Sequence, residues 1–529
     1  MALLVLDDLA LCLKVQYHRF GAMKALEDSI ITLRGAINCE APKALINRAP
    51  LLNNIGNHLG ERYRKTGLRA DLQEAIDFGR QAVSPNSSTE GTAQKEGWFN
   101  NLCNQLLTRY HRDGTMADLE EVIEISKKVI NETPEECPAR AHSMNILGQA
   151  LLDRYFVDGA PTSLEEAIEV ARQAITAVTN YALQKPPIFV LQNLLASLLR
   201  QRYEVDGAKE DIEEAIQLSR DATDTLPEGQ LERVRLIGNL GYSLKARYSK
   251  TGAAADLEEA ISCLRYALGS SDLDIPTRIS VGRNLSDFCT DNSEWQKAYE
   301  SSSTAVHVIP SLRVQSLGNL DKQHLLSQSV GLACDATAIA ICIGKAPIDA
   351  LSLLEEGRGV LATSVNEMRM DMLDLRENHP ELAERFEQRR YLLEQRDIES
   401  SWHVGPNWRY FAGKELDEVI DDVRNQQLLL PPDENAIRAA TKRGPIVMVN
   451  ASKYRCDAIL IEMHQIRCLA LPRLDIETIQ AKANKTTETE GDLGRPKVLE
   501  WLWEVIAKPV LDALEFVQPP SDHVWPHIW

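Results

Sequence analysis

The stretch Ile55–Ile76, IGNHLGERYRKTGLRADLQEAI, sets the pattern for the N-terminal half of the chain. Its residues Ile55, Leu59 and Tyr63 lie four apart, which places them on one face of a helix. The pattern occurs six times, with a period of 45 to 48 residues and with Leu or Ile four and eight residues before a central Tyr. The six central residues are Tyr17, Tyr63, Tyr110, Tyr155, Tyr203 and Tyr248.

A repeat of this length predicts a solenoid. Each copy is long enough for two helices, which cannot bury their apolar faces alone, so neighbouring hairpins must stack. The first helix, here named helix A, carries the Tyr and is expected to end at a glycine four residues later, because glycine readily adopts the left-handed conformation. These glycines are Gly67, Gly114, Gly159, Gly207 and Gly252. We therefore expect a right-handed, all-helical solenoid over residues 1–310.

The second helix of each copy, helix B, has its own start signal. In five of the six copies an oxygen-bearing side chain is followed three residues later by Glu, as in Asp71 with Glu74, which is the pattern of a capping box. The first copy has Ala25 instead. An Arg also directly precedes the Tyr in five copies, as Arg62 precedes Tyr63. We expect this Arg to pair with the acidic start of a helix B.

An asparagine recurs on helix A. It lies ten residues before the Tyr in four copies and nine before it in the sixth, at Asn53, Asn100, Asn145, Asn193 and Asn239. These amides could form a ladder that faces the solenoid groove and binds the backbone of an extended peptide. They could equally join adjacent repeats, since repeated polar contacts also serve stacking. The pattern leaves both interpretations open.

The composition of the 529 residues is that of a soluble protein of two or more domains, with 44% hydrophobic and 26% charged residues. The net charge of −19 argues against nucleic acid and also against acidic peptides as partners. No apolar run is long enough to span a bilayer, and the N-terminal apolar stretch contains Asp7 and Asp8, unlike a signal peptide. Ten cysteines without a CxxC indicate a reducing, cytoplasmic environment.

The periodic pattern ends near residue 310. A shorter hairpin around Trp295 is expected to close the array, followed by helices over about 312–343 and 347–370 and another from Pro380. A connection at 401–414 is rich in aromatic and helix-breaking residues. We therefore divide the chain into a repeat array at 1–310, a helical connecting region at 311–430 and an α/β region at 431–529.

Three short β-rich runs begin the α/β region, at 445–450, 457–462 and 466–471. Only Met463, His464 and Gln465 separate the second run from the third, so these two should form an antiparallel hairpin. The final residues, 522–529, resemble the start of another strand. So few strands cannot close a sheet covered by helices on both faces, and we expect the apolar faces of 446–449 and 458–461 to be partly uncovered.

Taken together, these features resemble the TPR-CHAT proteins of fungi, in which tetratricopeptide repeats precede a caspase-like domain. The segments that carry the resemblance are the long repeats, LLEEGRGVL at 353–361, GPIVMVNASKYRCDAILI at 444–461 and VWPHIW at 524–529. The resemblance implies an α-solenoid followed by a partial α/β caspase-like domain. Because the period is about 46 residues, against 34 in the standard tetratricopeptide repeat, the peptide-clamp positions of the standard repeat cannot be transferred.

The resemblance also implies a cysteine endopeptidase, but the chain lacks its dyad. In the family, a His before a Gly and a Cys in a Ser-Ala-Cys context end two core strands, and neither context occurs here. Both positions would fall beyond Trp529, as in a chain truncated within the CHAT domain. His464 precedes Cys468 by four residues across a tight turn, which is poor geometry for a dyad. We predict that the chain has no peptidase activity.

No other chemistry is indicated by the sequence. It contains no GxGxxG, P-loop or HExxH motif, and we expect neither a cofactor nor a metal site. Three functions stay open: a regulatory and targeting fragment of a caspase-like protease, a non-catalytic scaffold that binds peptides, and a pseudoenzyme. The first two require a protein or peptide partner in the solenoid groove.

Overall fold

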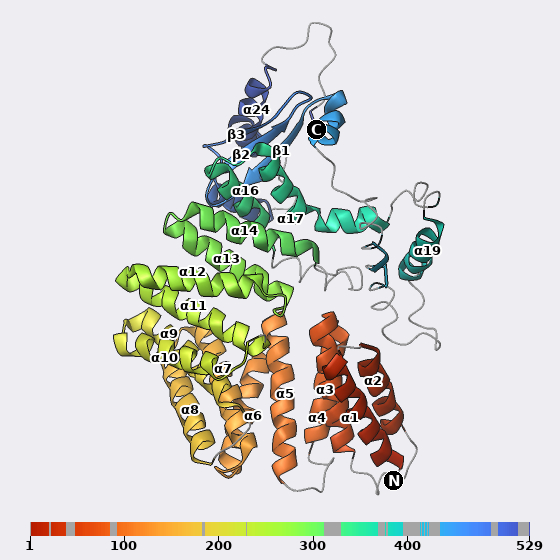
Figure 1. The fold of residues 1–529 in the computed structure, drawn as a ribbon, viewed down its shortest axis with the longest axis vertical. Coiled ribbons are helices and arrows are strands. Elements are labelled where there is room, and N and C mark those ends of the chain that lie inside the picture. Colours follow the sequence, from red (N-terminus) through yellow and green to blue (C-terminus); the bar gives the residue numbers. More distant parts are fainter. Residues whose placement is uncertain are drawn as a thin grey trace. The chain divides into compact units, whose positions relative to one another are not determined.

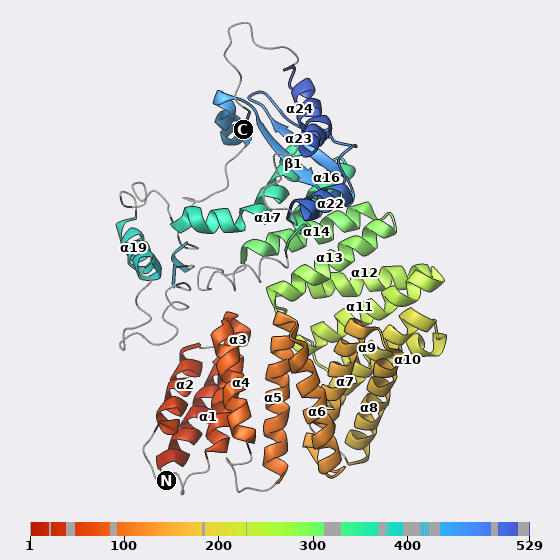
Figure 2. The ribbon, with the colours of Figure 1, turned by 180° about the vertical axis from the view of Figure 1, so that it is seen from behind.

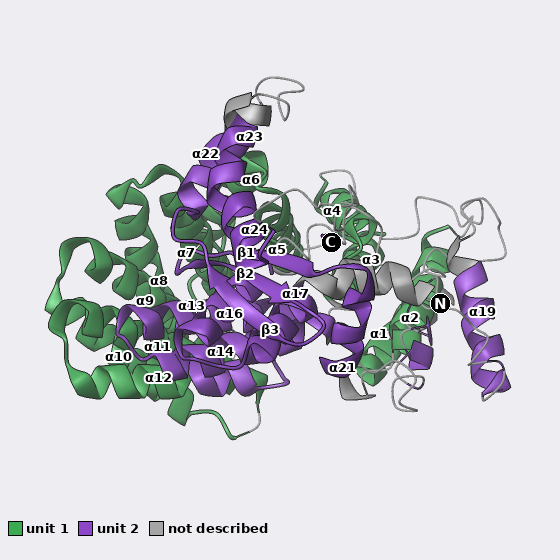
Figure 3. Ribbon diagram, turned by 90° about the horizontal axis from the view of Figure 1, so that it is seen from above, with its two compact units in different colours: residues 1–263 green, residues 264–529 purple. Residues whose placement is uncertain are grey.

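The computed structural model describes residues 2–20, 23–38, 48–84, 92–181, 186–228, 230–311, 329–368, 379–394, 434–487, 496–516 and 528–529, with isolated positions between 376 and 422. Figure 1 shows a mainly helical chain with one small sheet. The chain forms two compact units, Met1–Cys263 and Leu264–Trp529, hereafter unit 1 and unit 2 (Figure 3). Of the predicted connection at 401–414, all residues except 413 lie outside the described residues, as do residues 522–527 of the final run.

Unit 1 consists of antiparallel helix pairs. They are α1 (Ala2–Phe20) with α2 (Met23–Ile37), α3 (Ala49–Thr66) with α4 (Arg69–Val83), α5 (Thr92–Asp113) with α6 (Met116–Glu132), α7 (Pro138–Asp158) with α8 (Pro161–Asn180), and α9 (Ile188–Asp206) with α10 (Lys209–Asp224), followed by α11 (Leu231–Thr251) and α12 (Ala254–Gly269), whose last residues belong to unit 2. The A helices α3, α5, α7, α9 and α11 also pack against one another in turn. The predicted α-solenoid is therefore confirmed, whereas its right hand stays a prediction.

The repeated apolar positions form the core of unit 1. Ile55 and Leu59 of α3 are fully buried, as are Leu72 and Ile76 of α4. Leu9 of α1 is an exception, at 47% exposed. The apolar stripe thus packs between hairpins, which is how a solenoid builds one continuous core.

Helix A ends at the predicted glycine in each described copy. Gly67, Gly114, Gly159, Gly207 and Gly252 have φ between 65° and 80°, and each donates its N–H to the carbonyl of the Tyr four residues earlier. A side chain at this φ would be strained, so the glycines set the turn between the two helices. The Tyr side chains differ in burial: those of Tyr17 and Tyr203 are buried, and the other four are half-buried.

The capping-box prediction for helix B is wrong. The residue that precedes α4 is Leu68, and no side chain caps that helix. Asp71 is instead the third residue of α4, and its carboxylate accepts hydrogen bonds from Arg62 of α3. The same offset recurs at α6, α8, α10 and α12, so the oxygen-bearing side chain is the third residue of each of these helices rather than the residue that precedes it.

Unit 2 begins with two further helix pairs. They are α13 (Ile275–Asp291) with α14 (Trp295–Val308), which confirms the shorter hairpin, and α16 (Leu332–Cys342) with α17 (Pro347–Met368); a 3-10 turn (Ile309–Ser311) follows α14. A Cβ on Gly357 of α17 would collide with Ala333 of α16, so glycine allows these helices to touch. Further described segments are α19 (Pro380–Glu394), α21 (Glu434–Ala439) and a 3-10 turn (Ala440–Arg443).

The sheet of unit 2 has three described strands in the order β1 (Ile446–Ala451), β2 (Cys456–Ile461) and β3 (Ile466–Ala470). Both pairings are antiparallel, with Val449 opposite Ala458 and Ile459 opposite Cys468, so the predicted hairpin is confirmed. Trp529 bonds to the free edge of β1: its N–H donates to Pro445 and its carbonyl accepts from Val447. That pattern is the one made by a parallel neighbour.

Helices cover both faces of this sheet (Figures 1 and 2). On one face Ala458 and Leu460 pack with residues of α22 (Ile476–Thr487), α23 (Pro496–Leu502), the π-helical turn Trp503–Ala507 and α24 (Lys508–Ala513), while α16 packs against β1 and α17 against β3. All six residues of β2 are buried, so the predicted exposure of 458–461 is wrong. Residues 446–449 are half-buried. The helices α16 and α17, which lie in the predicted connecting region, supply the cover of the sheet that the α/β region alone was expected to lack.

Candidate functional site

A bidentate ion pair fixes each of four hairpins in unit 1. In the hairpin of α3 and α4, Arg62 donates from Nε and Nη2 to the two carboxylate oxygens of Asp71, at 2.8 and 2.7 Å. The equivalent pairs are Arg109 with Asp118, Arg202 with Asp211 and Arg247 with Asp256. The expectation that this Arg pairs with the acidic start of helix B is confirmed in these four hairpins, and the contact is structural.

The hairpin of α7 and α8 lacks this pair because Ser163 takes the place of the Asp. Arg154 instead lies 3.4 Å from Asp158 and 3.5 Å from Glu120, in two exposed ion pairs. Exposed pairs of this kind contribute little, so this hairpin is held less firmly at its loop than the other four.

The asparagines proposed for the groove do not all lie there. Asn53 and Asn100 are buried, so their side chains are not exposed as a peptide-binding ladder along the groove would require. Asn100 donates to the carbonyl of Ala139 and accepts from Ser143, both on α7. Asn53 accepts from Asn101 of the next helix A at 2.9 Å. Their amides are satisfied by the neighbouring repeat.

The remaining three asparagines are half-buried. Asn239 of α11 donates to Asn193 of α9 at 2.7 Å, which repeats the link between Asn101 and Asn53. Asn145 makes no side-chain hydrogen bond to another described residue. The links favour the interpretation that the amides join repeats, and a peptide-binding role for these five asparagines stays a prediction.

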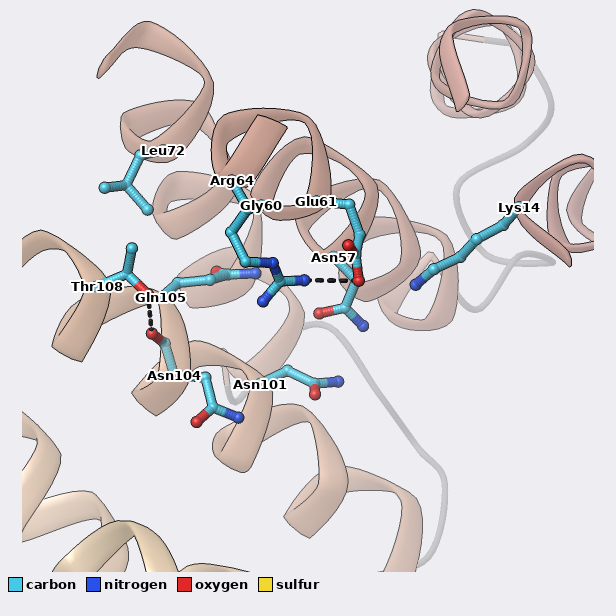
Figure 4. Close-up of a pocket in the computed structure, with 10 residues that line it drawn as sticks. All are labelled: Lys14, Asn57, Gly60, Glu61, Arg64, Leu72, Asn101, Asn104, Gln105 and Thr108. Carbon is cyan, nitrogen blue, oxygen red and sulfur yellow. Dashed lines mark hydrogen bonds and ion pairs between the residues drawn. The ribbon is translucent and has the colours of Figure 1, made fainter. Parts of the chain in front are cut away.

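A cavity lies between α1, α3 and α5 of unit 1 (Figure 4). Its volume is about 190 Å³, and nine of its ten lining residues come from three successive A helices. They are Lys14 from α1, Asn57, Gly60, Glu61 and Arg64 from α3, and Asn101, Asn104, Gln105 and Thr108 from α5, with Leu72 from α4. We call this cavity the groove pocket.

The groove pocket presents several polar groups that no described residue satisfies. Lys14 and the side-chain amides of Asn57 and Asn104 make no hydrogen bond or ion pair with another described residue. The oxygen of the Gln105 amide is buried and has no hydrogen-bond partner there either. Arg64, in contrast, pairs with Glu61 at 2.6 Å. The pocket therefore offers one amine and three amides to a ligand.

Glycines of α3 and α4 make the space in which Gln105 lies. A Cβ at Gly56 would stand 3.4 Å from the Gln105 nitrogen, and one at Gly79 would stand 3.1 Å from its oxygen. Gly60 also lies along this side chain. An alanine at Gly79 would press on the Gln105 oxygen, whereas alanine at Gly56 or Gly60 would make only ordinary contact with this side chain, so Gly79 is the glycine that makes room for Gln105.

A simple signal in the sequence could have found these residues. Counting six residues back from the Tyr, rather than ten, gives Asn57 and Asn104 in two successive copies. Four residues are about one helical turn, so both counts mark the same general face of helix A. The asparagines ten residues before the Tyr lie where neighbouring A helices contact each other, and the asparagines six residues before it line the pocket.

The residues weighed as a catalytic pair are not brought together. Cys468 lies on β3 and His464 in the turn before it, and His464 makes no hydrogen bond to a described cysteine. Burial raises the pKa of the Cys468 thiol and also that of Cys456, which disfavours the thiolate required for nucleophilic attack. Within the described ranges no group of three His, Cys, Asp or Glu residues could hold a metal ion.

None of the described helices is both long and apolar enough to cross a membrane. This finding concerns the helices of the described ranges only.

Comparisons with known proteins return similar structures only. No protein-family model matches the chain, and no curated protein matches it significantly. A Podosopora anserina protein with nearly identical TPR-like repeats, described as a kinesin light chain, has 21% identity over 44% of this chain and 100% of its own, with a TM-score of 0.29. BtubC from P. vanneervenii has 19% identity over 46% and 89%, with a TM-score of 0.33.

A third similar structure is a Rap protein complexed with Competence and Sporulation Factor. Its identity is 13% over 80% of this chain and 99% of its own, with a TM-score of 0.38. All three similarities are low. The repeat architecture of this chain therefore rests on its own helix pairs.

Proposed function

We propose that the chain is a protein-interaction scaffold whose repeats bind a peptide segment, and that the groove pocket is its point of contact. The observation that carries this proposal is the set of unsatisfied polar groups around one cavity. Asn57 and Asn104 each offer an amide donor and an acceptor to a ligand. An extended peptide backbone presents the complementary groups at regular intervals, which makes it a fitting occupant.

The placement of the pocket supports the same proposal. Its walls come from helix A of three neighbouring repeats, so a ligand there contacts several repeats at once. Repeat proteins offer extended surfaces of this kind to segments of other proteins. The solenoid needs none of the free amides for its own stacking, because Asn53, Asn101 and Asn100 already serve that purpose.

The test begins with selection of a phage-displayed random peptide library on the immobilised full chain. The affinities of the selected peptides are then measured by fluorescence anisotropy. Asn57→Ala and Asn104→Ala should each weaken binding about 2- to 10-fold, the effect of losing one hydrogen bond. Asn180→Ala, an exposed asparagine at the end of α8, is the matched control and should change nothing. Failure to select any peptide, or selected peptides that neither pocket variant affects, would refute the proposal.

A second proposal concerns residues 431–529. We propose that they are the N-terminal part of a caspase-like CHAT domain, and that the chain is the regulatory portion of a cysteine protease whose dyad lies beyond Trp529. The supporting observation is a sheet with helices on both faces and Trp529 bonded along β1 as a parallel neighbour would be. Transcript sequence beyond Trp529 tests it: a His-Gly and a later Cys are expected, and a stop codon there would favour the scaffold or a pseudoenzyme.

A further inference from the structure

Basic residues two positions after a central Tyr link neighbouring repeats at the end of helix A. In the third copy this residue is Arg112, and its guanidinium lies 5.7 Å from the ring centre of Tyr63 in the copy before it. Nη1 of Arg112 also donates to the carbonyl of Gly67 at 2.9 Å. In the sixth copy the amine of Lys250 lies 4.6 Å from the ring centre of Tyr203 and donates to the carbonyl of that residue. The end of a helix A thus has a place for one cation.

Two properties of this place favour a cation. The face of a Tyr ring carries negative charge density and attracts a cation that lies within about 6 Å of the ring centre. The last carbonyl groups of a helix have no partner within the helix and form the negative end of its dipole. The side chain of Arg112 is only 6% exposed, so these groups, together with Asp113 at 3.5 Å, replace most of its contact with water.

The fourth and fifth copies lack the basic residue. Val157 and Val205 stand two positions after the Tyr in these copies, so the next repeat supplies no cation to Tyr110 of α5 or to Tyr155 of α7. Both rings are half-buried, and neither has a cation over it in the described part of the chain. Two successive repeats therefore offer the place for a cation without the residue that fills it elsewhere.

The end of α7 has no cation of its own either. Its last turn contains no basic residue, whereas the last turn of α5 contains Arg112. The carbonyl of Gly159, equivalent to that of Gly67, accepts no hydrogen bond from a described residue. Asp158 adds a negative charge, which Arg154 at 3.4 Å offsets only weakly because water reaches both side chains. The helix dipole and this carboxylate favour a cation from another molecule.

The same edge of the array is apolar as well. Phe156, Val157 and Val205 are each more than half exposed. The stem of a Lys or Arg side chain packs along such a surface while its charged end reaches polar groups. The net charge of −19 also attracts basic partners, in agreement with the expectation that acidic peptides are disfavoured.

We infer that the ends of α5 and α7 bind the basic side chains of a partner protein, with one Lys or Arg over Tyr110 and one over Tyr155. These side chains take the places that Arg112 and Lys250 take in other copies. The helices α5 and α7 pack against each other, and packed helices lie about 8 to 10 Å apart. Two basic residues three positions apart in an extended segment match this spacing, at about 3.3 Å per residue. The site shares no residue with the groove pocket.

The experiment uses the full chain and fluorescein-labelled, amidated octapeptides of Gly and Ser. One peptide carries two Arg three positions apart, a second carries two Lys and a third two Met at the same positions. Binding is measured by fluorescence anisotropy. We expect the Arg or the Lys peptide to bind about 5- to 30-fold more tightly than the Met peptide, the effect of two exposed cation–π contacts. Whichever of the two binds more tightly identifies the cation that the site prefers.

A variant that fills both places from within the chain assigns the preference to this site. Val157→Arg combined with Val205→Lys supplies the cations that other copies have, and it should abolish the preference for the basic peptides. The matched control is Ile31→Arg combined with Ile188→Lys, which adds the same charges at two other exposed aliphatic residues and should keep most of the preference. Circular dichroism verifies the fold of each variant.

Two further measurements use the same internal comparison. The melting temperature of the filled variant should exceed those of the wild type and of the control, because the new cations meet unpaired carbonyl groups and Tyr rings. Lys250→Val opens the equivalent place over Tyr203 and should tighten binding of the basic peptides. If the filled variant does not fold, failure of Lys250→Val to tighten binding overturns the inference.

The outcomes separate this inference from the proposed function. Equal binding of the three peptides by the wild type overturns the inference, as does a preference that the filled variant keeps or that the control variant also loses. Loss of the preference on Asn104→Ala would place the basic peptides in the groove pocket, which overturns the inference and leaves the proposed function intact. Failure of the phage selection beside a preference that only the filled variant loses overturns the proposed function alone.

Discussion

Ion pairs between neighbouring helices recur along unit 1, whereas the polar contacts that hold the end of β1 in unit 2 occur once each. In unit 1 an ion pair links the B helices of neighbouring repeats five times, always between residues 39 to 42 apart: Arg34 with Glu74, Arg80 with Glu121, Lys127 with Glu166, Arg172 with Glu214 and Arg220 with Glu259. In unit 2 the end of β1 and the loop after it are held by the hydrogen bonds of Asn450 with Cys334, Ser452 with Asp335 and Tyr454 with Asp287, between residues 116 to 167 apart.

This difference determines what one substitution can do. A recurring contact has equivalents that keep the neighbouring hairpins in place, so its loss acts on one repeat. A contact that occurs once has no equivalent, so its loss releases a whole element. The burial of each contact then sets the size of the effect, and the variants below test both statements.

The largest effect is expected at the most buried contact of unit 1. Asp71→Ala leaves the guanidinium of Arg62, which is 3% exposed, without its carboxylate. A buried charge without its partner costs about 3 to 5 kcal/mol of unfolding free energy. The measurement is urea denaturation followed by far-UV circular dichroism.

The equivalent substitution in another repeat is the control. Asp256→Ala removes the same carboxylate beside Arg247, whose side chain is 26% exposed and can be hydrated. We expect it to cost about 1 kcal/mol, near the upper range for pairs open to water. Equal losses of unfolding free energy for the two variants would show that burial does not determine how much this ion pair contributes to stability.

The next effect is expected in unit 2. The hydroxyl of Tyr454 donates to the carboxylate of Asp287 at 2.7 Å, and its ring packs edge-on against Trp295. Tyr454→Phe keeps the ring contact and removes the hydrogen bond, which should lower the unfolding free energy by about 1.5 to 3 kcal/mol. Calorimetry measures this loss. Tyr391→Phe on α19, an exposed tyrosine, should be neutral, and a neutral Tyr454→Phe would show that the loop after β1 is held by its other contacts.

The same difference explains what could be predicted from the sequence. The hairpins and their glycine turns follow from local spacing, so Gly67 and its equivalents were placed correctly. The role of Asp71 was predicted wrongly, because the spacing alone does not distinguish the residue that precedes a helix from the third residue of that helix. Asn57 was missed because it lies one helical turn away from Asn53, the asparagine that the ten-residue count selects. The contact of Tyr454 with Asp287 occurs once, so no periodic pattern in the sequence predicts it.

A smaller effect, a gain, is expected where the recurring pattern is interrupted. Ser163→Asp restores the carboxylate that the other four hairpins place opposite the Arg. Because Arg154 is 39% exposed, the restored pair should add only about 0.5 to 1 kcal/mol to the unfolding free energy. Urea denaturation measures the gain, and Ser163→Asn, which has the same shape without the charge, should show little of it. A loss on Ser163→Asp would mean that Glu120 and Asp158 already supply too much negative charge.

The smallest effect depends on pH and joins two neighbouring repeats. His111 of α5 lies 2.7 Å from the carboxylate of Asp153 on α7, and this hydrogen bond raises the pKa of His111 above its usual 6.5. A pKa raised by folding means that the contribution is fully present below about 6.5 and is lost as the pH rises through the folded-state pKa. Since the His111 side chain is 51% exposed, the contribution should stay below about 1 kcal/mol. The melting temperature of the wild type should therefore exceed that of His111→Gln at pH 5.5 and approach it at pH 8.5. A difference that is constant across this range, or larger at pH 8.5, would show that the pair does not link the two repeats through its charge.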